Sequence, residues 1–455
     1  MSDSADAKLR VAIIGSGPAG SYAAGHLLRH TADELHVDLY ERLPTPWGLV
    51  RAGVAPDHPK IKSVTNIYER TAEHPRLRLF ANVEFGRHVT LADLREHYHA
   101  IVYAVGTPVD RAMGIPGEDL AGSYAATDFV GWYNGHPDFR EREFDLRGER
   151  VVVVGAGNVA LDVARMLVLT RAELAVTDIA DHALEVLASS GVREVVVLAR
   201  RGPAQAAFTN PELRELGELS DADVIVDPEE LALGEAIADP DADPTALRNV
   251  EILREYSTRP PAGRSRRVVL RFLLSPLALT GTGRVGSLTL ARNELTVGAG
   301  GALRARATDQ RLELPAQAVF RAIGYRGTPL ADVPFDTERE LIANDGGRVR
   351  SGEYVVGWAK RGPSGVIGTN KKDANETIER LLEDLAAGRL LDPAPISDEA
   401  LERFIRERQP ELVDYGDWLT IDRRERGLGE PAGRPRVKLT TVPELLEAIG
   451  WGGDE

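Results

Sequence analysis

The sequence predicts an α/β fold with two domains, each built on a parallel β-sheet that is covered by helices. Two observations support this prediction. Short apolar runs rich in valine and isoleucine alternate with helix-like segments along most of the 455 residues, a pattern typical of parallel sheets. Two of these runs, at residues 10–15 and 150–155, lead into a glycine-rich turn and then a helix-like segment. A chain of this length corresponds to two or three domains of ordinary size.

The first glycine-rich turn follows the strand expected at residues 10–15 and precedes a helix with one apolar face. Gly15 permits a tight turn, Gly17 lets a pyrophosphate approach the backbone, and Gly20 lets helix and strand pack closely. The next expected strand, residues 36–41, ends at Glu41, whose carboxylate is able to accept hydrogen bonds from ribose hydroxyls. The alternative is an ordinary strand–turn–helix joint with a surface glutamate.

The second glycine-rich turn contains Gly155 and Gly157, with Ala160 in place of the third glycine. Alanine is tolerated there with slightly wider packing. The following strand, residues 194–201, ends in Arg200 and Arg201 instead of an acid. Two guanidiniums bind a 2′-phosphate that a carboxylate would repel, so we expect NADP(H) at this turn. The alternative is a solvated arginine pair at a strand end.

Further segments complete the two domains. We expect strands at residues 100–106, 318–325 and 353–358, an antiparallel hairpin or meander at 276–296, extra helix at 170–190 and a helix ending at Gly388. Residues 238–249 predict a loop rich in proline and aspartate. The chain is expected to cross between domains after Gly106 and after Gly324. Residues 108–324 would then form a domain inserted into a discontinuous domain of residues 1–107 and 325–455.

Composition excludes several classes of protein. The formal charge of -15 and the pI of about 5.3 argue against nucleic-acid binding and against an anionic membrane surface. The chain has no cysteine, so it holds no disulfide and no cysteine-ligated metal, and we expect no metal site. Neither a signal peptide nor an apolar run of membrane length is found, so we expect a cytoplasmic protein without membrane contact.

Together the two turns predict a redox function. The first turn, with its carboxylate, suits the ADP half of FAD, and the second turn, with its arginines, suits NADPH. A chain that holds both nucleotides is suited to passing a hydride from nicotinamide to flavin. Because there is no cysteine, the electrons cannot leave through an internal disulfide. The residues alone leave two acceptors open, an external one-electron carrier or a small oxidant such as oxygen or a quinone.

Several longer stretches resemble the adrenodoxin-reductase type of ferredoxin–NADP⁺ reductase, in particular its bacterial members. They are residues 44–62, 128–134, 157–165, 199–216 and 357–374, with a weaker stretch at 433–439. The resemblance implies two Rossmann-like dinucleotide-binding domains, with the NADP domain inserted into a discontinuous FAD domain. It also implies non-covalent FAD, NADP(H), and single-electron delivery to a ferredoxin-type iron–sulfur protein by a monomer.

The resemblance also implies site residues. The family's valine at one flavin position is phenylalanine here, at residue 85, where a main-chain contact would survive the change. Trp358 would shield the flavin by stacking, and the alternative is a core tryptophan. The residues implied for FAD are Gly15, Gly17, Ala19, Gly20, Glu41, Leu49, Phe85, Trp358, Gly365, Val366 and Ile367. Those implied for NADP are Ala156, Gly157, Asn158, Val159, Arg200, Arg201, Glu212 and Gly365.

Three further residues match family positions with other roles. His58 and Glu215 lie near the flavin in the family and are candidates for proton relay. The alternatives are a turn residue for His58 and a solvated helix face for Glu215. Arg214 matches a partner-binding arginine. Two other basic clusters, at residues 264–271 and 360–372, are candidates for docking an acidic ferredoxin, although such clusters are usually solvated.

Two rival functions remain at the level of sequence. One is an NADPH oxidase or monooxygenase that uses oxygen, and the other is a flavin-bound redox sensor without turnover. The long stretches of resemblance favour the ferredoxin reductase over both.

Overall fold

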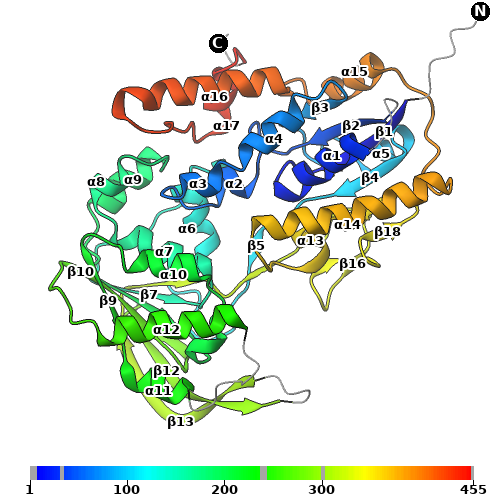
Figure 1. The fold of residues 1–455 in the computed structure, drawn as a ribbon. Helices are drawn as coiled ribbons and strands as arrows, with labels where there is room; N and C mark the ends of the chain where they lie inside the picture. The colour runs from blue at the N-terminus through cyan, green and yellow to red at the C-terminus, as the bar shows by residue number, and fades with distance from the viewer. Residues whose placement is uncertain (1–7, 31–34, 236–242, 299–302, 452–455) are drawn as a thin grey trace, which may run out of the picture. The chain divides into compact units, whose positions relative to one another are not determined.

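The computed structural model divides into two compact units, each with its own parallel sheet (Figure 1). The structure describes residues 8–30, 35–235, 243–298 and 303–451. The first unit comprises the chain up to Val109, Asn134–Pro137 and the chain from Tyr325 onward, and the second comprises Asp110–Tyr133 and Asp138–Gly324.

The first unit is built on a six-stranded sheet in the order β18–β19–β4–β1–β2–β3. Neighbouring strands are parallel except for β18 and β19, which are antiparallel. Winding proceeds outward from β1 in both directions, so β1 and β4 flank the point where nucleotides bind in such sheets. The strands are β1 (Leu9–Ile14), β2 (Leu35–Tyr40), β3 (Leu77–Phe80), β4 (Ala100–Tyr103), β18 (Arg348–Arg350) and β19 (Glu353–Val355).

Helices cover both faces of this sheet, as the alternation of side chains along β1 requires. Val11 and Ile13 belong to a buried cluster with α1, α4, α14 and α16, whereas Ala12 and Ile14 belong to one with α5 and α15. Both faces are therefore apolar and protected from water. The helices are α1 (Pro18–His30), α4 (Thr65–Ala72), α5 (Leu91–His97), α14 (Ile367–Ala386), α15 (Asp398–Arg408) and α16 (Tyr415–Gly429).

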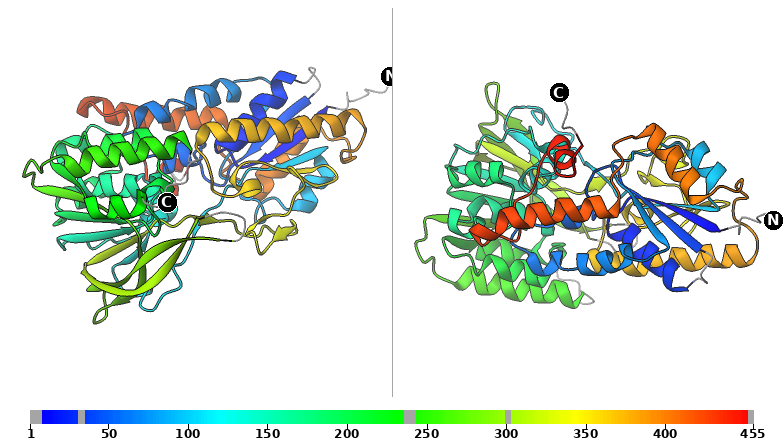
Figure 2. Two further views of the ribbon diagram at one scale, coloured as in Figure 1. Left: turned by 60° about the horizontal axis from the view of Figure 1, so that its bottom comes forward. Right: turned by 90° about the horizontal axis from the view of Figure 1, so that it is seen from above.

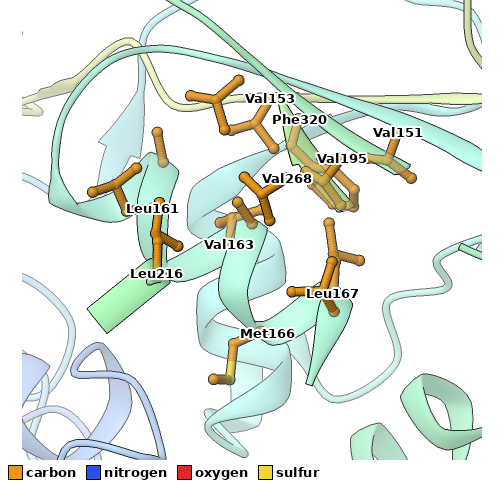
Figure 3. Packing of buried hydrophobic residues seen from close by; sticks show 14 of the residues in the cluster. Val151, Val153, Leu161, Val163, Met166, Leu167, Val195, Leu216, Val268 and Phe320 are labelled. Atoms are coloured by element: carbon orange, nitrogen blue, oxygen red, sulfur yellow. The ribbon is translucent and has the colours of Figure 1, made fainter. Parts of the chain in front are cut away.

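The second unit is built on an all-parallel sheet in the order β6–β14–β7–β8–β10–β9. Its core joins the central strands to α7 and α10, as Figure 3 shows for Val153, Phe320, Leu161 and Leu216. The elements are β6 (Ser123–Ala125), β7 (Arg150–Val154), α7 (Asn158–Val168), β8 (Glu194–Leu198), α10 (Asn210–Leu216), β9 (Ala222–Val226), β10 (Arg266–Arg271) and β14 (Ala318–Arg321).

A separate antiparallel sheet extends the second unit, and Figure 2 shows it in yellow-green from two further sides. The predicted hairpin is confirmed as β11 (Leu274–Thr280) and β12 (Ser287–Val297), and β13 (Leu303–Pro315) adds a third strand. The extra helix predicted at residues 170–190 is confirmed as α8 (Arg171–Leu174) and α9 (Asp181–Ala188).

Two local predictions concern the start of one helix and the end of another. The loop predicted at residues 238–249 is wrong for its second half, because α12 (Pro244–Thr258) begins there. Asp243 caps this helix by accepting a hydrogen bond from the Thr245 N–H at 2.6 Å, and Pro244 occupies the first helical position. Residues 238–242 lie outside the described residues. The helix predicted to end at Gly388 does so, since α14 ends at Ala386 and Gly388 adopts a φ of 63°.

Candidate functional site

The first glycine-rich turn follows β1 and has the close backbone contacts that require glycine. Gly15 adopts a φ of 108°, and a Cβ there would lie 2.5 Å from the Ala104 carbonyl oxygen. A Cβ on Gly20 would lie 2.0 Å from the Gly15 carbonyl oxygen. Both distances are far below van der Waals contact, so these glycines let α1 start directly against the end of β1. The N-terminus of α1 then presents its N–H groups at the turn, where they suit a phosphate.

Gly17 faces a second segment of the chain, within the stretch of residues 44–62 that carries the family resemblance. Its closest neighbour in the Cβ direction is the Gly48 Cα at 3.9 Å, and a Cβ on Gly48 would lie 2.9 Å from the Gly17 Cα. The adjoining Trp47 has a φ of 81°, rare for a residue other than glycine. Its N–H donates to the Ser16 Oγ at 3.3 Å. Leu49, a predicted flavin residue, directly follows this pair and is 47% exposed.

Glu41 lies directly after β2, next to the turn. Its Oε2 accepts hydrogen bonds from the Ser16 hydroxyl at 2.7 Å and from the Ser16 N–H at 3.2 Å. Its Oε1 accepts from the Leu43 N–H at 3.1 Å. These donors fix the carboxylate beside the glycine-rich turn, in the place where this fold binds a ribose.

Trp358 and the turn before it lie against α1. A Cβ on Gly357, whose φ is 72°, would lie 2.6 Å from the Ala19 Cβ. The Gly357 N–H donates to the Asp373 carboxylate at 2.5 Å, which fixes this turn to α14. The Trp358 ring stacks on Tyr325 with centroids 5.5 Å apart. Its Nε1–H is buried and has no hydrogen-bond partner among the described residues, which is unusual for a buried donor.

The remaining predicted flavin residues lie in loops of the same unit. Phe85 follows β3 and contacts the Tyr103 ring edge to face, with centroids 6.0 Å apart. Gly365 has a φ of 78°, and the exposed Val366 precedes Ile367, where α14 begins. The glycine-rich turn, Glu41 and the loop of Phe85 follow the carboxyl ends of parallel strands. The loop of Gly365 leads into the long helix α14. The fit to FAD rests on the glycine contacts, the fixed carboxylate and the unpaired indole donor.

The second turn follows β7 and separates the tasks of its two glycines. Gly155 has a φ of 145°, and a Cβ there would lie 2.2 Å from the Ala322 carbonyl oxygen, so only glycine fits. A Cβ on Gly157 would have no described heavy atom within 4 Å. Gly157 therefore leaves open space at the N-terminus of α7, which suits a pyrophosphate. Ala160, which stands in place of the third glycine, is fully buried against the core.

The neighbours of this turn are also fixed. The Ala156 carbonyl accepts a hydrogen bond from the Ala207 N–H at 2.7 Å. The Asn158 side-chain oxygen accepts from the Thr209 N–H at 2.8 Å. The Asn158 side chain is thus engaged in holding the following loop, and its place at the start of α7 leaves main-chain groups for the nucleotide. Val159 is half-buried against the core.

Arg200 and Arg201 follow β8, the strand next to β7. Arg200 is exposed, whereas Arg201 is half-buried and donates to the Gln205 carbonyl at 3.2 Å. Burial and the nearby charge of Arg200 lower the pKa of the Arg201 guanidinium. Two like charges at the end of a strand are relieved by an anion, so this pair fits a 2′-phosphate.

Glu212 and Glu215 lie on α10 beside a buried arginine of α7. The Arg165 side chain is 3% exposed and lies 3.5 Å from Glu212 and 3.8 Å from Glu215. It also binds Asp162 at 2.7 Å. Glu212 is buried and Glu215 is 40% exposed at its side chain. Glu215 is therefore tied to a buried ion cluster instead of a fully solvated helix face, and Arg214 between them is exposed.

His58 belongs to the first unit and Glu215 to the second, so their joint role in proton relay stays a prediction. His58 is buried at the start of α3 (Pro59–Lys62). Its carbonyl oxygen accepts hydrogen bonds from the N–H groups of Ile61 and Lys62, both at 3.1 Å. The backbone of His58 is thus fixed by the helix that it begins.

The two basic clusters are less available for docking than their composition suggests. Arg266 donates to the Leu169 carbonyl at 2.8 Å, and Arg271 binds Glu230 at 2.8 Å. Lys360 binds Asp373 at 2.9 Å. The arginines at positions 264, 267 and 361 are likewise engaged, by the Ala222 carbonyl, Glu194 and Asn370. These side chains hold the fold together. Lys371 and Lys372 are exposed, and the Lys372 ammonium lies 3.9 Å from the Glu376 carboxylate.

The fold and the two turns define a class, the flavoprotein oxidoreductases that bind FAD and a pyridine nucleotide. The family model for pyridine nucleotide-disulphide oxidoreductase matches residues 9–202. The disulphide of that name has no counterpart here, because the chain has no cysteine. None of the helices in the described parts of the chain has the length and apolar character to span a membrane.

Relatives along the full length identify the particular family. The chain is 52% identical to the NADPH-ferredoxin reductase FprA of Mycobacterium leprae over 97% of its length and 98% of the relative. It is 42% identical to the mitochondrial NADPH:adrenodoxin oxidoreductase of Salvelinus fontinalis, over 96% of its length and 90% of the relative. The solved structure of Mycobacterium tuberculosis FprA in complex with NADPH superposes with a TM-score of 0.93 at 50% identity, covering 97% of this chain and 99% of that one.

The chain therefore belongs to the adrenodoxin-reductase type of ferredoxin–NADP⁺ reductases. It is an FAD-dependent oxidoreductase that uses NADP(H) and transfers electrons between NADPH and ferredoxin. The predicted family, fold class, activity and cofactors are thus confirmed.

Proposed function

We propose that the first turn of this reductase holds FAD, that the second holds NADP(H), and that electrons pass from NADPH through FAD to a ferredoxin-type iron–sulfur protein. The observation that carries the assignment is the opposite charge beside the two turns. A carboxylate fixed by Ser16 stands beside the first turn, and an arginine pair stands beside the second. Bound FAD supplies the redox chemistry, because a flavin accepts a hydride and releases electrons one at a time.

In the FAD site, the N-terminus of α1 and the backbone of Gly15, Gly17, Ala19 and Gly20 bind the pyrophosphate. Glu41 binds the ribose. Leu49, Phe85, Trp358 and the main chain of Gly365, Val366 and Ile367 surround the rest of the cofactor. Trp358 stacks beside the flavin, and its unpaired indole N–H supports a role in contact with the cofactor.

In the NADP site, Ala156, Gly157, Asn158 and Val159 bind the pyrophosphate at the N-terminus of α7. Arg200 and Arg201 bind the 2′-phosphate, which distinguishes NADPH from NADH. Glu212 and Gly365 lie toward the nicotinamide end of the nucleotide. These residues place the nicotinamide for hydride transfer, a step that needs orientation and no protein acid or base.

Proton movement and partner binding depend on three further residues. His58 and Glu215 hold and pass the proton that accompanies the change in flavin charge. The exposed Arg214, which lies on α10, binds the acidic ferredoxin.

We further propose a FAD domain of residues 1–107 and 325–455 with an NADP domain of 108–324 inserted, and a monomer in the cytoplasm. Light scattering of the protein as it elutes from a size-exclusion column measures its mass and so tests the proposed monomer.

One experiment on purified protein separates this function from its rivals. NADPH added without oxygen should bleach the yellow protein, and cytochrome c reduction should then require added ferredoxin. Oxygen uptake at the same rate without ferredoxin would support an NADPH oxidase or monooxygenase instead. A yellow protein that NADPH does not bleach would support a redox sensor without turnover.

A further inference from the structure

The segment Trp47–Ala52 is anchored at its start by Trp47, which is buried and contacts the Tyr68 ring, but the short helix that follows has little of its own to hold it in place. The helix α2 (Leu49–Ala52) has one turn, and Val50 is its only buried residue. The segment starts at Trp47 with a φ of 81°, and Gly48 follows with a φ of 48°. Such backbone conformations persist only where surrounding contacts determine them. This segment lies against Gly17, so its position affects the space beside the first glycine-rich turn.

Glu425 of α16 supplies a charged contact to this segment. Its side chain is fully buried, and its two oxygens accept from the Arg51 guanidinium at 2.6 and 2.8 Å. This is a bidentate pair, the geometry in which arginine and carboxylate bind most specifically. Arg51 stands two residues after Leu49, in the last turn of the short helix. The ion pair thus joins the C-terminal region of the chain to the segment beside the turn (Figure 1).

The other partners of Glu425 fix its own position. Arg436 donates to Oε2 at 3.0 Å, and the Leu439 N–H donates to Oε1 at 2.9 Å. Arg436 is in turn bound to Asp422 at 2.6 Å. Both donors come from the stretch after α16, which is neither helix nor strand, so these contacts hold the carboxylate independently of Arg51.

Arg51 is also held from two further sides. Its guanidinium carbon lies 5.3 Å from the centroid of the Trp418 ring, a cation–π distance. Its carbonyl oxygen accepts a hydrogen bond of 3.2 Å from the Lys438 ammonium, and Lys438 as a residue is 5% exposed. Both groups belong to the same C-terminal region. Backbone and side chain of Arg51 are therefore both fixed by residues more than 360 positions away.

We propose that Glu425 is a positioning residue for FAD: through Arg51 it fixes the segment Trp47–Ala52 against the first glycine-rich turn and so slows the release of the flavin. Glu425 does not touch the cofactor in this scheme. It acts by keeping Gly48 close to Gly17 and the Trp47 N–H on Ser16, whose hydroxyl also holds Glu41. The inference rests on the proposed binding of FAD at this turn.

The test compares FAD release from holoenzymes with Glu425→Gln, Arg51→Lys and Glu430→Gln. Glu430 is the matched control, because it is an exposed carboxylate just past the end of α16. FAD release after dilution is followed by the recovery of flavin fluorescence. E425Q removes the charge from a buried pair and should release FAD at least about tenfold faster. R51K keeps a charge but loses the bidentate geometry, so its rate should lie between wild type and E425Q.

The outcomes separate this inference from the proposed function. Release rates equal to wild type in both E425Q and R51K would overturn it, and so would a lower melting temperature of E425Q with unchanged FAD release. If E425Q does not fold, R51K decides alone, with faster release supporting the inference and an unchanged rate overturning it. Faster release in E430Q by the same factor would also overturn it. A wild-type protein that binds no FAD would instead contradict the proposed function.

Discussion

The side-chain amide of Asn293 donates a hydrogen bond of 2.7 Å to the carbonyl oxygen of Arg200. Asn293 lies on β12 in the antiparallel sheet, whereas Arg200 follows β8 in the parallel sheet. The second amide hydrogen of Asn293 goes to the Ser275 Oγ, also at 2.7 Å, and the residue is 4% exposed. The antiparallel sheet therefore fixes the backbone that carries the arginine pair.

Replacing Asn293 by alanine should lower the selectivity for NADPH over NADH. The change removes the donor to the partly buried Arg200 carbonyl, at a cost of about 1 kcal/mol. Because that backbone sets the position of both guanidiniums, kcat/KM for NADPH should fall about tenfold and kcat/KM for NADH much less. Steady-state kinetics with both nucleotides measures this. Ser275→Ala is the control, since it keeps the bond to Arg200. An equal fall for both nucleotides would show that Asn293 acts only on stability.

Neutral replacements of Arg200 and Arg201 test the phosphate site directly. R200Q and R201Q should each weaken the binding of NADPH by about 1–3 kcal/mol for every charge-assisted bond lost. NADH lacks the 2′-phosphate and should bind nearly as before. Titration of each variant with both nucleotides gives the affinities. Arg193→Gln, an exposed arginine at the other end of β8, is the matched control. A similar loss for both nucleotides would refute the assignment of this pair to the phosphate.

The two glycines of the second turn should fail in different ways. Gly157→Leu places a side chain in open space, so the protein should fold, remain yellow and lose NADPH binding. Gly155→Ala places a Cβ 2.2 Å from the Ala322 carbonyl in a left-handed conformation, so it should unfold at a lower temperature. Absorbance spectra and thermal melts distinguish the two. If G157L lost FAD while keeping NADPH, the two nucleotides would be assigned to the wrong turns.

The sequence predicted the features that local chemistry dictates. Gly15 and Gly155 were predictable because a left-handed turn and a close backbone approach leave only one residue type. The position of Arg200 and Arg201 was predictable because they directly follow a recognisable strand next to such a turn. The start of α12 was also within reach, since Asp243 followed by Pro244 is a common helix start.

Contacts between distant parts of the chain were not predictable in this way. Arg51 and Glu425 are separated by 374 positions, and neither residue has a local pattern that names its partner. In the sequence, Asn293 resembles any polar residue of an exposed strand. Its contact with Arg200 becomes apparent only from the packing of the antiparallel sheet against the parallel sheet. The arginines of residues 264–271 looked like a docking surface because composition does not show that Glu194 and Glu230 bind two of them. Tertiary packing decides each of these cases.

The buried ion pair also predicts a dependence of stability on pH. Burial opposes the charge of Glu425, but the guanidiniums of Arg51 and Arg436 hold its pKa below the ordinary value of 4.5. The unfolded chain then binds the proton more readily than the folded chain. Glu425 therefore contributes stability that is fully present above the unfolded pKa and is lost as the pH falls through the folded one.

The difference in the free energy of unfolding between wild type and E425Q isolates this contribution. It should be constant between about pH 6 and pH 8 and should narrow below the ordinary value, by at most about 1.4 kcal/mol per pH unit. Urea unfolding at saturating FAD measures it at each pH. Asp422 lies beside the pair and titrates in both proteins, so the subtraction removes the contribution that it makes to both. A difference that stayed constant well below pH 4.5 would mean that Glu425 is not held as a carboxylate by its two arginines.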